Sequence, residues 1–282
     1  MSKTITACFH PILGCLKAAE EFLGPDRKWN ENNLLQQLFV DIIKNAMNDV
    51  EQIPELKRMA SLSCEEINAF LKENGFDIQL PPFPTGSFGV ASILDILVNW
   101  VYPGEKTTLF CSDGHPYHGA KMEDNVKFFS ILDSKEIVAQ LTAKTGEKLF
   151  MFMGNPPKDM LDLFAKVSLI RSKMNPNFSF TELVFPCVEL DREGDISWLI
   201  GMHTTATNGL PYEIAQAIQQ TKFHLDEKGA HVKSAAAETL RAMSLSKKLE
   251  INRPFYVWME QDGLNIPFFA AYLDNDVWQQ KQ

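Results

Sequence analysis

The stretch "DEKGAHVKSAAAETLRAMS", residues 226–244, decides how the chain is interpreted. Two periodicities overlap in it. Ala236, Leu240 and Met243 fall on one face of a helix built from good helix formers. At its start, however, small or apolar residues alternate with polar ones, which is the period of a strand with one buried face. We therefore consider both a surface helix and a loop able to add itself to a sheet.

The length of this connection favours a function of its own. Between Gly229 and Asn252 lie 22 residues, flanked by the strand candidates "TKFHLDE" and "PFYVWME". Connections of this length are unusual in a compact domain and are commonly functional or disordered.

The flanking sequence predicts an α+β protein. Apolar residues at i, i+3 and i+4 predict helices over 31–50, 64–75, 158–171 and roughly 211–220. Short apolar or alternating runs from "ILDILVNWV" to "IPFFAAYL" predict strands, and "PPFPTGSFG" at 81–89 is the densest Pro and Gly stretch. We read the N-terminal apolar patch as broken by His10 and Pro11. Helices first and strands afterwards are typical of an α+β fold.

Composition excludes several classes of function. The net charge is −9 and no basic run exceeds Lys247–Lys248, which argues against nucleic acid and anionic membranes as partners. No apolar segment is long enough to span a bilayer. The N-terminus lacks the clean apolar centre of a signal peptide, so the compartment stays open, with a cytoplasmic or non-classically secreted protein favoured. The odd number of cysteines, five, indicates reduced thiols.

Motifs for catalysis or metal binding are weak. Cys111, His115 and His118 in "CSDGHPYHG" resemble half a zinc site, but the spacing matches no strong zinc pattern. The chain has no phosphate loop, dinucleotide fingerprint, HExxH or nucleophile elbow. We expect a protein that is not an enzyme and has no metal or cofactor.

Several segments, in order, resemble those of serpins. "AIQQTKFHLDEKGAHVKSAAA" (217–237) is similar to the fifth strand of the serpin main sheet and the hinge that follows it. "INRPFYVWME" and "IPFFAAYL" resemble the paired C-terminal strands. Upstream, "ILVN" (96–99) is similar to the central strand, "GAKMEDNVKFF" to the segment after it, and "DISWLIGM" to a turn of the family. The resemblance covers roughly residues 90–275.

The resemblance implies one domain over 1–282. Its expected parts are a shortened helical N-terminal part (1–80), a strand-rich body (90–275) and a long exposed reactive-centre loop (230–251). The fold implied is α+β, with a large mixed β-sheet and a second sheet or barrel.

The resemblance also implies protease inhibition. The family's usual loop length places the scissile bond at Met243–Ser244, with Arg241 as a competing cleavage point. The implied partner is a chymotrypsin- or elastase-like serine protease, or a cysteine protease. The protease would attack the loop, so that this protein, as a monomer, would act as its suicide substrate. The alternative is a non-inhibitory serpin-fold protein that binds a partner or ligand without loop insertion.

The residues implied for loop insertion lie in two regions. Asn99 and Gln219 match positions in the sheet-opening region, where Gln219 replaces a histidine that usually pairs with the asparagine. Cys187 stands where a lysine often pairs with the glutamate of the hinge. The implied hinge comprises Glu227, Gly229, Ala230, Val232, Lys233, Ser234, Ala235 and Ala236. In it, Val232 and Lys233 depart from the small residues typical of the family.

Overall fold

The computed structural model describes residues 4–94, 99–111, 113–132, 134–229 and 247–281, except for the side chain of Ile43. The described helices are α1 (Phe9–Leu23), α2 (Leu34–Ala46), α3 (Cys64–Glu73) and α4 (Met160–Ser172). Short 3₁₀ turns occupy Met47–Gln52, Ser197–Leu199 and Asn275–Val277. None of the described helices is both long enough and apolar enough to cross a membrane.

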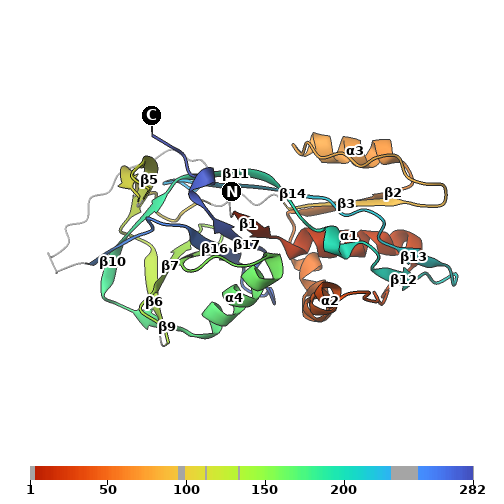
Figure 1. Ribbon diagram of the computed structural model, residues 1–282, viewed down its shortest axis with the longest axis horizontal. Coiled ribbons are helices and arrows are strands. Elements are labelled where there is room, and N and C mark those ends of the chain that lie inside the picture. Colours follow the sequence, from red (N-terminus) through yellow and green to blue (C-terminus); the bar gives the residue numbers. More distant parts are fainter. Residues whose placement is uncertain (1–3, 95–98, 112, 133, 230–246, 282) are drawn as a thin grey trace.

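Two larger sheets form one end of the molecule (Figure 1). The seven-stranded sheet is antiparallel, in the order β1 (Ile5–Ala7), β17 (Phe269–Leu273), β16 (Phe255–Glu260), β8 (Lys148–Met153), β7 (Ile137–Thr142), β6 (Val126–Ile131) and β9 (Met174–Asn177). The four-stranded sheet is mixed, in the order β15 (Lys247–Glu250), β10 (Phe180–Pro186), β5 (Pro116–Met122) and β4 (Glu105–Phe110). In it, β10 and β15 run parallel.

Three strand pairs complete the β structure. They are β2 (Leu56–Ser61) with β3 (Gly89–Leu94), β11 (Val188–Gly194) with β14 (Gln219–Leu225), and β12 (His203–Thr205) with β13 (Pro211–Glu213). Figure 1 shows β2 and β3, with α3 on one side and α1 on the other, at the end opposite the large sheets. The β11–β14 pair extends between the two ends.

Helix α1 is the central helix of the second end. Its buried residues include Phe9, Leu13 and Leu16, which join the main core. Gly14 allows β3 to pack closely on the helix: a Cβ at this position would lie 2.2 Å from Ser92 Oγ and 2.9 Å from Ser92 Cβ. The next residue of β3, Ile93, faces the other way and packs with Ile67 and Leu71 of α3. Strand β3 therefore has a helix on each face.

A buried cluster of hydrogen-bonding side chains fixes the start of α1. His10 Nε2 lies 3.4 Å from Asp49 Oδ2, and both side chains are fully buried. Asn265 donates to Asp49 through its amide side chain at 2.7 Å and its backbone N–H at 2.9 Å. Burial alone would raise the pKa of Asp49, but the hydrogen bonds from His10 and Asn265 outweigh burial and hold it below its ordinary value. The cluster joins α1 to the loop before β17.

The predicted helices over 31–50, 64–75 and 158–171 are confirmed as α2, α3 and α4. The helix predicted over 211–220 is wrong. Residues 211–213 pair with β12, and β14 begins at Gln219, so hydrogen bonds to neighbouring strands replace the helical ones. Helix α1 was not predicted, because Pro11 was taken to break the pattern. Pro11 lies in the first turn, where the missing N–H has no helical partner to lose.

Candidate functional site: the gap between β3 and β14

Among the described residues, strands β3 and β14 each have one edge without a neighbouring strand. In the part of the chain that the structure describes, β3 pairs with β2 and β14 pairs with β11. The two pairs meet at one end through an antiparallel bridge between Asn99 and Gly229. Below this bridge a gap separates them.

The two strands that border the gap run in the same direction. Strand β3 leads toward Trp100 and β14 leads toward Asp226, and these segments meet. The Trp100 N–H donates to Lys228 O at 3.3 Å, and its indole N–H donates to Asp226 O at 3.0 Å. The bridge at Gly229 is antiparallel, so the chain has already reversed there. Its positive φ of 81° is a conformation that glycine adopts without steric cost.

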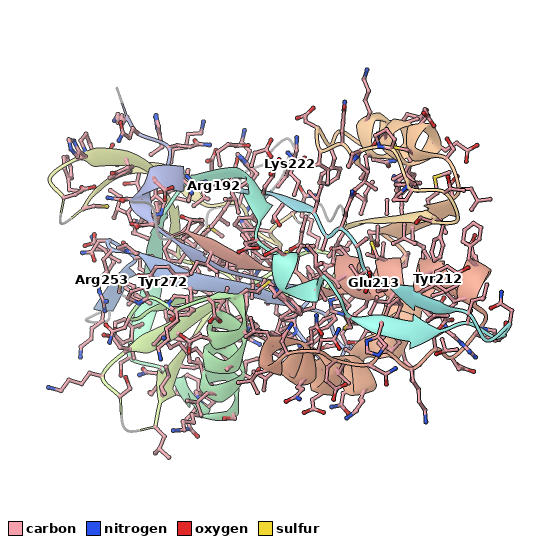
Figure 2. All side chains as sticks on the ribbon, turned by 45° about the vertical axis from the view of Figure 1, so that its right-hand side comes forward. Arg192, Tyr212, Glu213, Lys222, Arg253 and Tyr272 are labelled. Carbon is pink, nitrogen blue, oxygen red and sulfur yellow. The ribbon has the colours of Figure 1, made fainter. Side chains whose placement is uncertain are left out.

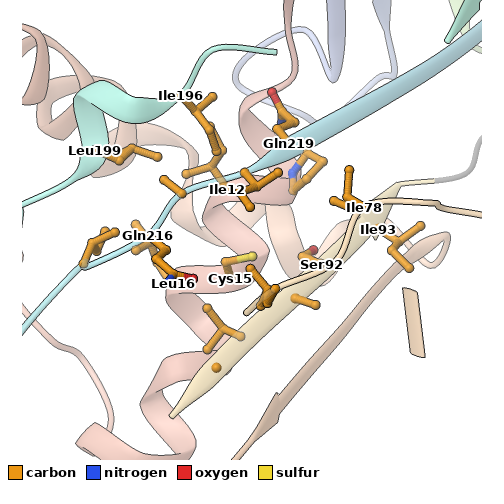
Figure 3. A pocket seen from close by; sticks show the side chains of 18 of the residues that line it. Ile12, Cys15, Leu16, Ile78, Ser92, Ile93, Ile196, Leu199, Gln216 and Gln219 are labelled. Atoms are coloured by element: carbon orange, nitrogen blue, oxygen red, sulfur yellow. The ribbon is translucent and has the colours of Figure 1, made fainter. Parts of the chain in front are cut away.

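A cavity of about 320 Å³ lies in the gap, lined by β3 on one side and by residues 212–223 on the other. Its floor is α1, with Ile12, Cys15 and Leu16, and Figure 3 shows Cys15 beside Ser92 of β3. Residues 74–88, which we call the strap, also line it, with Phe76, Ile78, Leu80 and Phe83. The strap packs on β3 from the face opposite α1. The gap is therefore closed on one face by a helix and on the other by a loop.

The strap is tied to β14 across the gap. The Asp77 N–H donates to Gln220 Oε1 at 3.0 Å, and the Asp77 carboxylate lies 3.7 Å from Lys222 Nζ. Lys222 also stands 5.8 Å from the centre of the Phe76 ring and 3.0 Å from Asp191 on β11. Figure 2 shows Lys222 beside the β11–β14 pair. Because these groups are largely at the surface, the tie is weak and can be opened at small cost.

Strand β14 is held to α1 at the lower end of the gap. The amide side chain of Gln219 donates to Cys8 O at 2.8 Å, and the Thr221 hydroxyl lies 3.9 Å from Cys8 Sγ. Burial raises the pKa of both Cys8 and Cys15 to about 12, so both thiols are neutral at physiological pH.

The chain beyond β14 is fixed by the segment that follows β3. Besides the bonds of Trp100, the Gly104 N–H donates to Glu227 O at 2.7 Å. The Glu227 side chain is buried, and its carboxylate lies 3.6 Å from Lys106 Nζ of β4. Burial, and then the carboxylates of Glu227 and Asp226, raise the pKa of Cys187 to about 12. Position 187, where the family often has a lysine, carries a neutral cysteine in this chain. Lys106 therefore provides the positive charge beside Glu227.

A histidine joins β11 and β14 near this point. His224 Nδ1 lies 2.6 Å from Glu189 Oε2, and its Nε2 lies 3.3 Å from Asp226 Oδ2. Burial would lower the pKa of His224, but the two carboxylates outweigh burial and raise it above its ordinary value.

The structure places the expected insertion residues as follows. Glu227, Gly229 and Asn99 come together at the upper end of the gap. Gln219 lies at the other end of β14, on Cys8, so Asn99 and Gln219 are not brought together. The expected residues Ala230, Val232, Lys233, Ser234, Ala235, Ala236, Arg241, Met243 and Ser244 lie outside the described residues.

Two residues at the upper end of the gap were not foreseen from the sequence. Trp100 follows the quoted segment "ILVN" directly, and only its buried indole N–H shows that it holds Asp226. Lys106 has no sequence signal, because its partner Glu227 is distant along the chain. Among the described residues, no three His, Cys, Asp or Glu side chains gather as a metal site would require.

Comparisons of sequence identify no relative. No protein family model matches the chain, and no curated protein matches it in sequence.

Comparison of structures identifies the fold. Human thyroxine-binding globulin complexed with thyroxine is similar with a TM-score of 0.57 at 10% identity, covering 96% of this chain and 91% of that one. Mouse protein-Z dependent protease inhibitor gives 0.57 at 12% identity, covering 97% and 91%. A serpin from Schistosoma mansoni gives 0.52 at 13% identity, covering 74% and 63%.

The chain therefore has the α+β serpin fold, with mixed sheets and helices, as the resemblance in the sequence implied. Serpin-fold proteins are not enzymes, which agrees with the lack of a catalytic motif in the sequence.

Proposed function

We propose that the protein is a serpin-like protease inhibitor that acts as a suicide substrate, with Met243–Ser244 as the bond that the protease attacks. The gap between β3 and β14 carries the proposal. It lies between two strands of the same direction, and at Gly229 the chain already runs antiparallel to Asn99, in the segment that follows β3. A strand continuing from Gly229 would pair antiparallel with both edges, so its backbone groups would be satisfied on both sides.

The length of the gap and the length of the segment from Gly229 to Met243 support the same proposal. From Gln219 to Gly229 the gap extends about 33 Å, at roughly 3.3 Å per residue. The segment from Gly229 to Met243 extends about 46 Å on the same scale. It is therefore long enough to fill the gap and carry an acyl-enzyme attached at Met243 beyond its lower end. The residues after the bond lead into β15, which pairs with β10, so cleavage frees only the N-terminal part.

The alternation of side chains along residues 230–236 suits such an inserted strand. Ala230, Val232, Ser234 and Ala236 would share one face, and His231 and Lys233 the other. Burial of Lys233 would be costly, so we assign its face to the side that solvent reaches. The proposed partner is a chymotrypsin- or elastase-like protease, or a cysteine protease. Cleavage at Arg241 by a trypsin-like enzyme is the competing reaction.

The strap favours a second candidate, a non-inhibitory protein that binds a partner or ligand without insertion. Its bonds from Asp77 to Gln220 and Lys222 cross the gap and must open before a strand can enter. The similarity to thyroxine-binding globulin, a ligand-binding protein of the same fold, supports this candidate equally.

Incubation with chymotrypsin-, elastase-, trypsin- and cysteine-type proteases separates the two candidates. Inhibition gives a covalent band of summed mass on a denaturing gel. Ala230→Arg places a charge on the face assigned to the interior and should convert the inhibitor into a substrate. The matched variant His231→Arg, on the other face, should still form the complex. Cleavage near residue 243 with no covalent band and no rise in melting temperature contradicts inhibition.

A further inference from the structure

We propose that the chamber between β3 and β14 is a binding site for a small, neutral, mostly apolar molecule with at least one hydrogen-bond donor. The chamber is the cavity described above, with α1 as its floor and the strap as its roof. Nothing in the inhibitory function requires such a ligand.

The size and lining of the chamber are those of a ligand site. Its volume of about 320 Å³ falls within the range of small-molecule pockets. Several parts of the chain converge on it, chiefly α1, β3, the strap and residues 212–223, with Ile196 and Leu199 beside them. Figure 3 shows Ile12 and Leu16 from below, and Ile196 and Leu199 from the side, turned toward the same space. An apolar molecule would exchange contact with water for contact with these side chains.

The charges of the lining select a neutral ligand. Among its described residues, Lys222 and Glu213 are the ionic groups, apart from the thiols. Lys222 is already paired with Asp191 and Asp77, and Glu213 is exposed to solvent. Cys8 and Cys15 keep their protons, because burial raises the pKa of each. A charged ligand would lose its hydration here without gaining a counter-charge.

Of two buried oxygens that lack partners among the described residues, the Gln219 amide oxygen selects a hydrogen-bond donor, whereas the Ser92 hydroxyl can donate or accept. Ser92 Oγ and Gln219 Oε1 are both buried, both belong to residues that line the chamber, and neither has a hydrogen-bond partner in the described structure. Gln219 Oε1 is an acceptor only, because its amide nitrogen donates to Cys8 O. An O–H or N–H group on the ligand would satisfy one of them, and buried polar groups without partners are costly.

The ligand would occupy the space that an inserting strand needs. This consequence rests on the proposed inhibitory function, whereas the binding itself does not. A molecule held between β3 and β14 delays insertion, so the acyl-enzyme has more time to be hydrolysed. Binding should therefore shift the protein from inhibitor toward substrate.

The neutral fluorophore N-phenyl-1-naphthylamine, which has one N–H, tests binding without any protease. We expect a saturable rise in its fluorescence with the wild-type protein. Ala217→Trp, which fills the chamber from its β14 side, should weaken binding by at least about tenfold, or 1.4 kcal/mol. The control Leu169→Trp, on the exposed surface of α4, should bind as the wild type does. Equal binding by all three proteins, or no binding to the wild type, overturns the proposal.

Alkylation of the wild-type thiols gives a second test that does not depend on the folding of a variant. Cys15 lies at the floor of the chamber and Cys111 lies outside it, and both residues are partly exposed. Since burial raises the pKa of both thiols, alkylation is run at alkaline pH. Saturating fluorophore should slow alkylation of Cys15, measured by peptide mass spectrometry, and leave that of Cys111 unchanged. Equal rates at Cys15 with and without the fluorophore overturn the proposal.

The regulatory consequence is tested with chymotrypsin. Saturating fluorophore should lower the covalent fraction and raise the cleaved fraction of the wild-type protein. If no covalent complex forms even without the fluorophore, the inhibitory function fails while the binding site stands. If the complex forms to the same extent with the site saturated, the regulation is overturned.

Discussion

The contact between Gly14 and Ser92 fixes how closely β3 lies on α1, and therefore the position of one edge of the gap. The perturbation is Gly14→Ala. Its new Cβ would lie 2.2 Å from Ser92 Oγ and 2.9 Å from Ser92 Cβ. Rotation of the hydroxyl can relieve the first clash. The second involves an atom fixed to the backbone of β3, so the strand itself must move.

Two opposing effects determine the magnitude. Replacing a glycine inside a helix by alanine stabilises the helix by about 1 kcal/mol. Overpacking against β3 costs about 1–3 kcal/mol. We therefore expect Gly14→Ala to leave the free energy of unfolding unchanged or to lower it by up to about 2 kcal/mol. In a Ser92→Gly background the clash is gone, and the same substitution should stabilise the protein by about 1 kcal/mol.

A double-mutant cycle by urea unfolding measures the difference, with Ser92→Ala as a third background. Ser92→Ala removes the hydroxyl but keeps the Cβ at 2.9 Å, so it should restore only part of the stability. We expect a coupling energy of about 1–3 kcal/mol between positions 14 and 92. If Gly14→Ala stabilises the wild type as much as it stabilises the Ser92→Gly variant, the close approach of β3 to α1 is refuted.

Three further substitutions test the electrostatics and the upper end of the gap. The lowered pKa of Asp49 contributes stability that is present above about pH 4 and lost as the pH falls. Asp49→Asn should cost about 2 kcal/mol at neutral pH in urea unfolding and flatten the decline in acid. The raised pKa of His224 contributes stability that is present below about pH 6.5 and lost as the pH rises. Since this side chain is partly exposed, His224→Gln should remove an effect of less than about 1 kcal/mol, seen as a smaller fall in melting temperature from pH 6 to about pH 8. Trp100→Phe removes the bond to Asp226 O and should cost about 1 kcal/mol. Amide exchange at Gly104 should then accelerate; an unchanged rate would contradict the role of the indole.

Local patterns predicted most of the elements but not their partners. The strands "KLFMFM" and "PFYVWME" could be recognised singly, and in the structure they pair as β8 and β16. The helix expected over 211–220 failed because the strands β11 and β12 compete for its backbone groups. Helix α1 was not predicted, because the N-terminal apolar patch was read as broken by His10 and Pro11, although a proline in the first turn does not interrupt a helix.

In the candidate site, too, some residues were implied by the sequence, whereas their partners became known only from the structure. The resemblance to serpins implied roles for Glu227 and Gly229 in "DEKG", and the positive φ of this glycine suits the reversal of the chain. The groups that hold this segment, Trp100 at Asp226 and Lys106 at Glu227, come from more than a hundred residues earlier in the chain. No local pattern encodes such a pairing.

The sequence alone determined that the chain is an α+β protein with the segments of a serpin in their usual order, and that a long connection leaves β14 at Gly229. Its alternation of small and polar residues is a local property, set by side chains that neighbour one another in the chain. Only the tertiary structure decided that β3 and β14 run in the same direction and stand apart, with no strand between them in the described part of the chain. Helix α1 covers one face of this gap and the strap covers the other. The physical reason is that the width of a gap depends on the packing of distant elements, here Ser92 on Gly14 and Gln219 on Cys8.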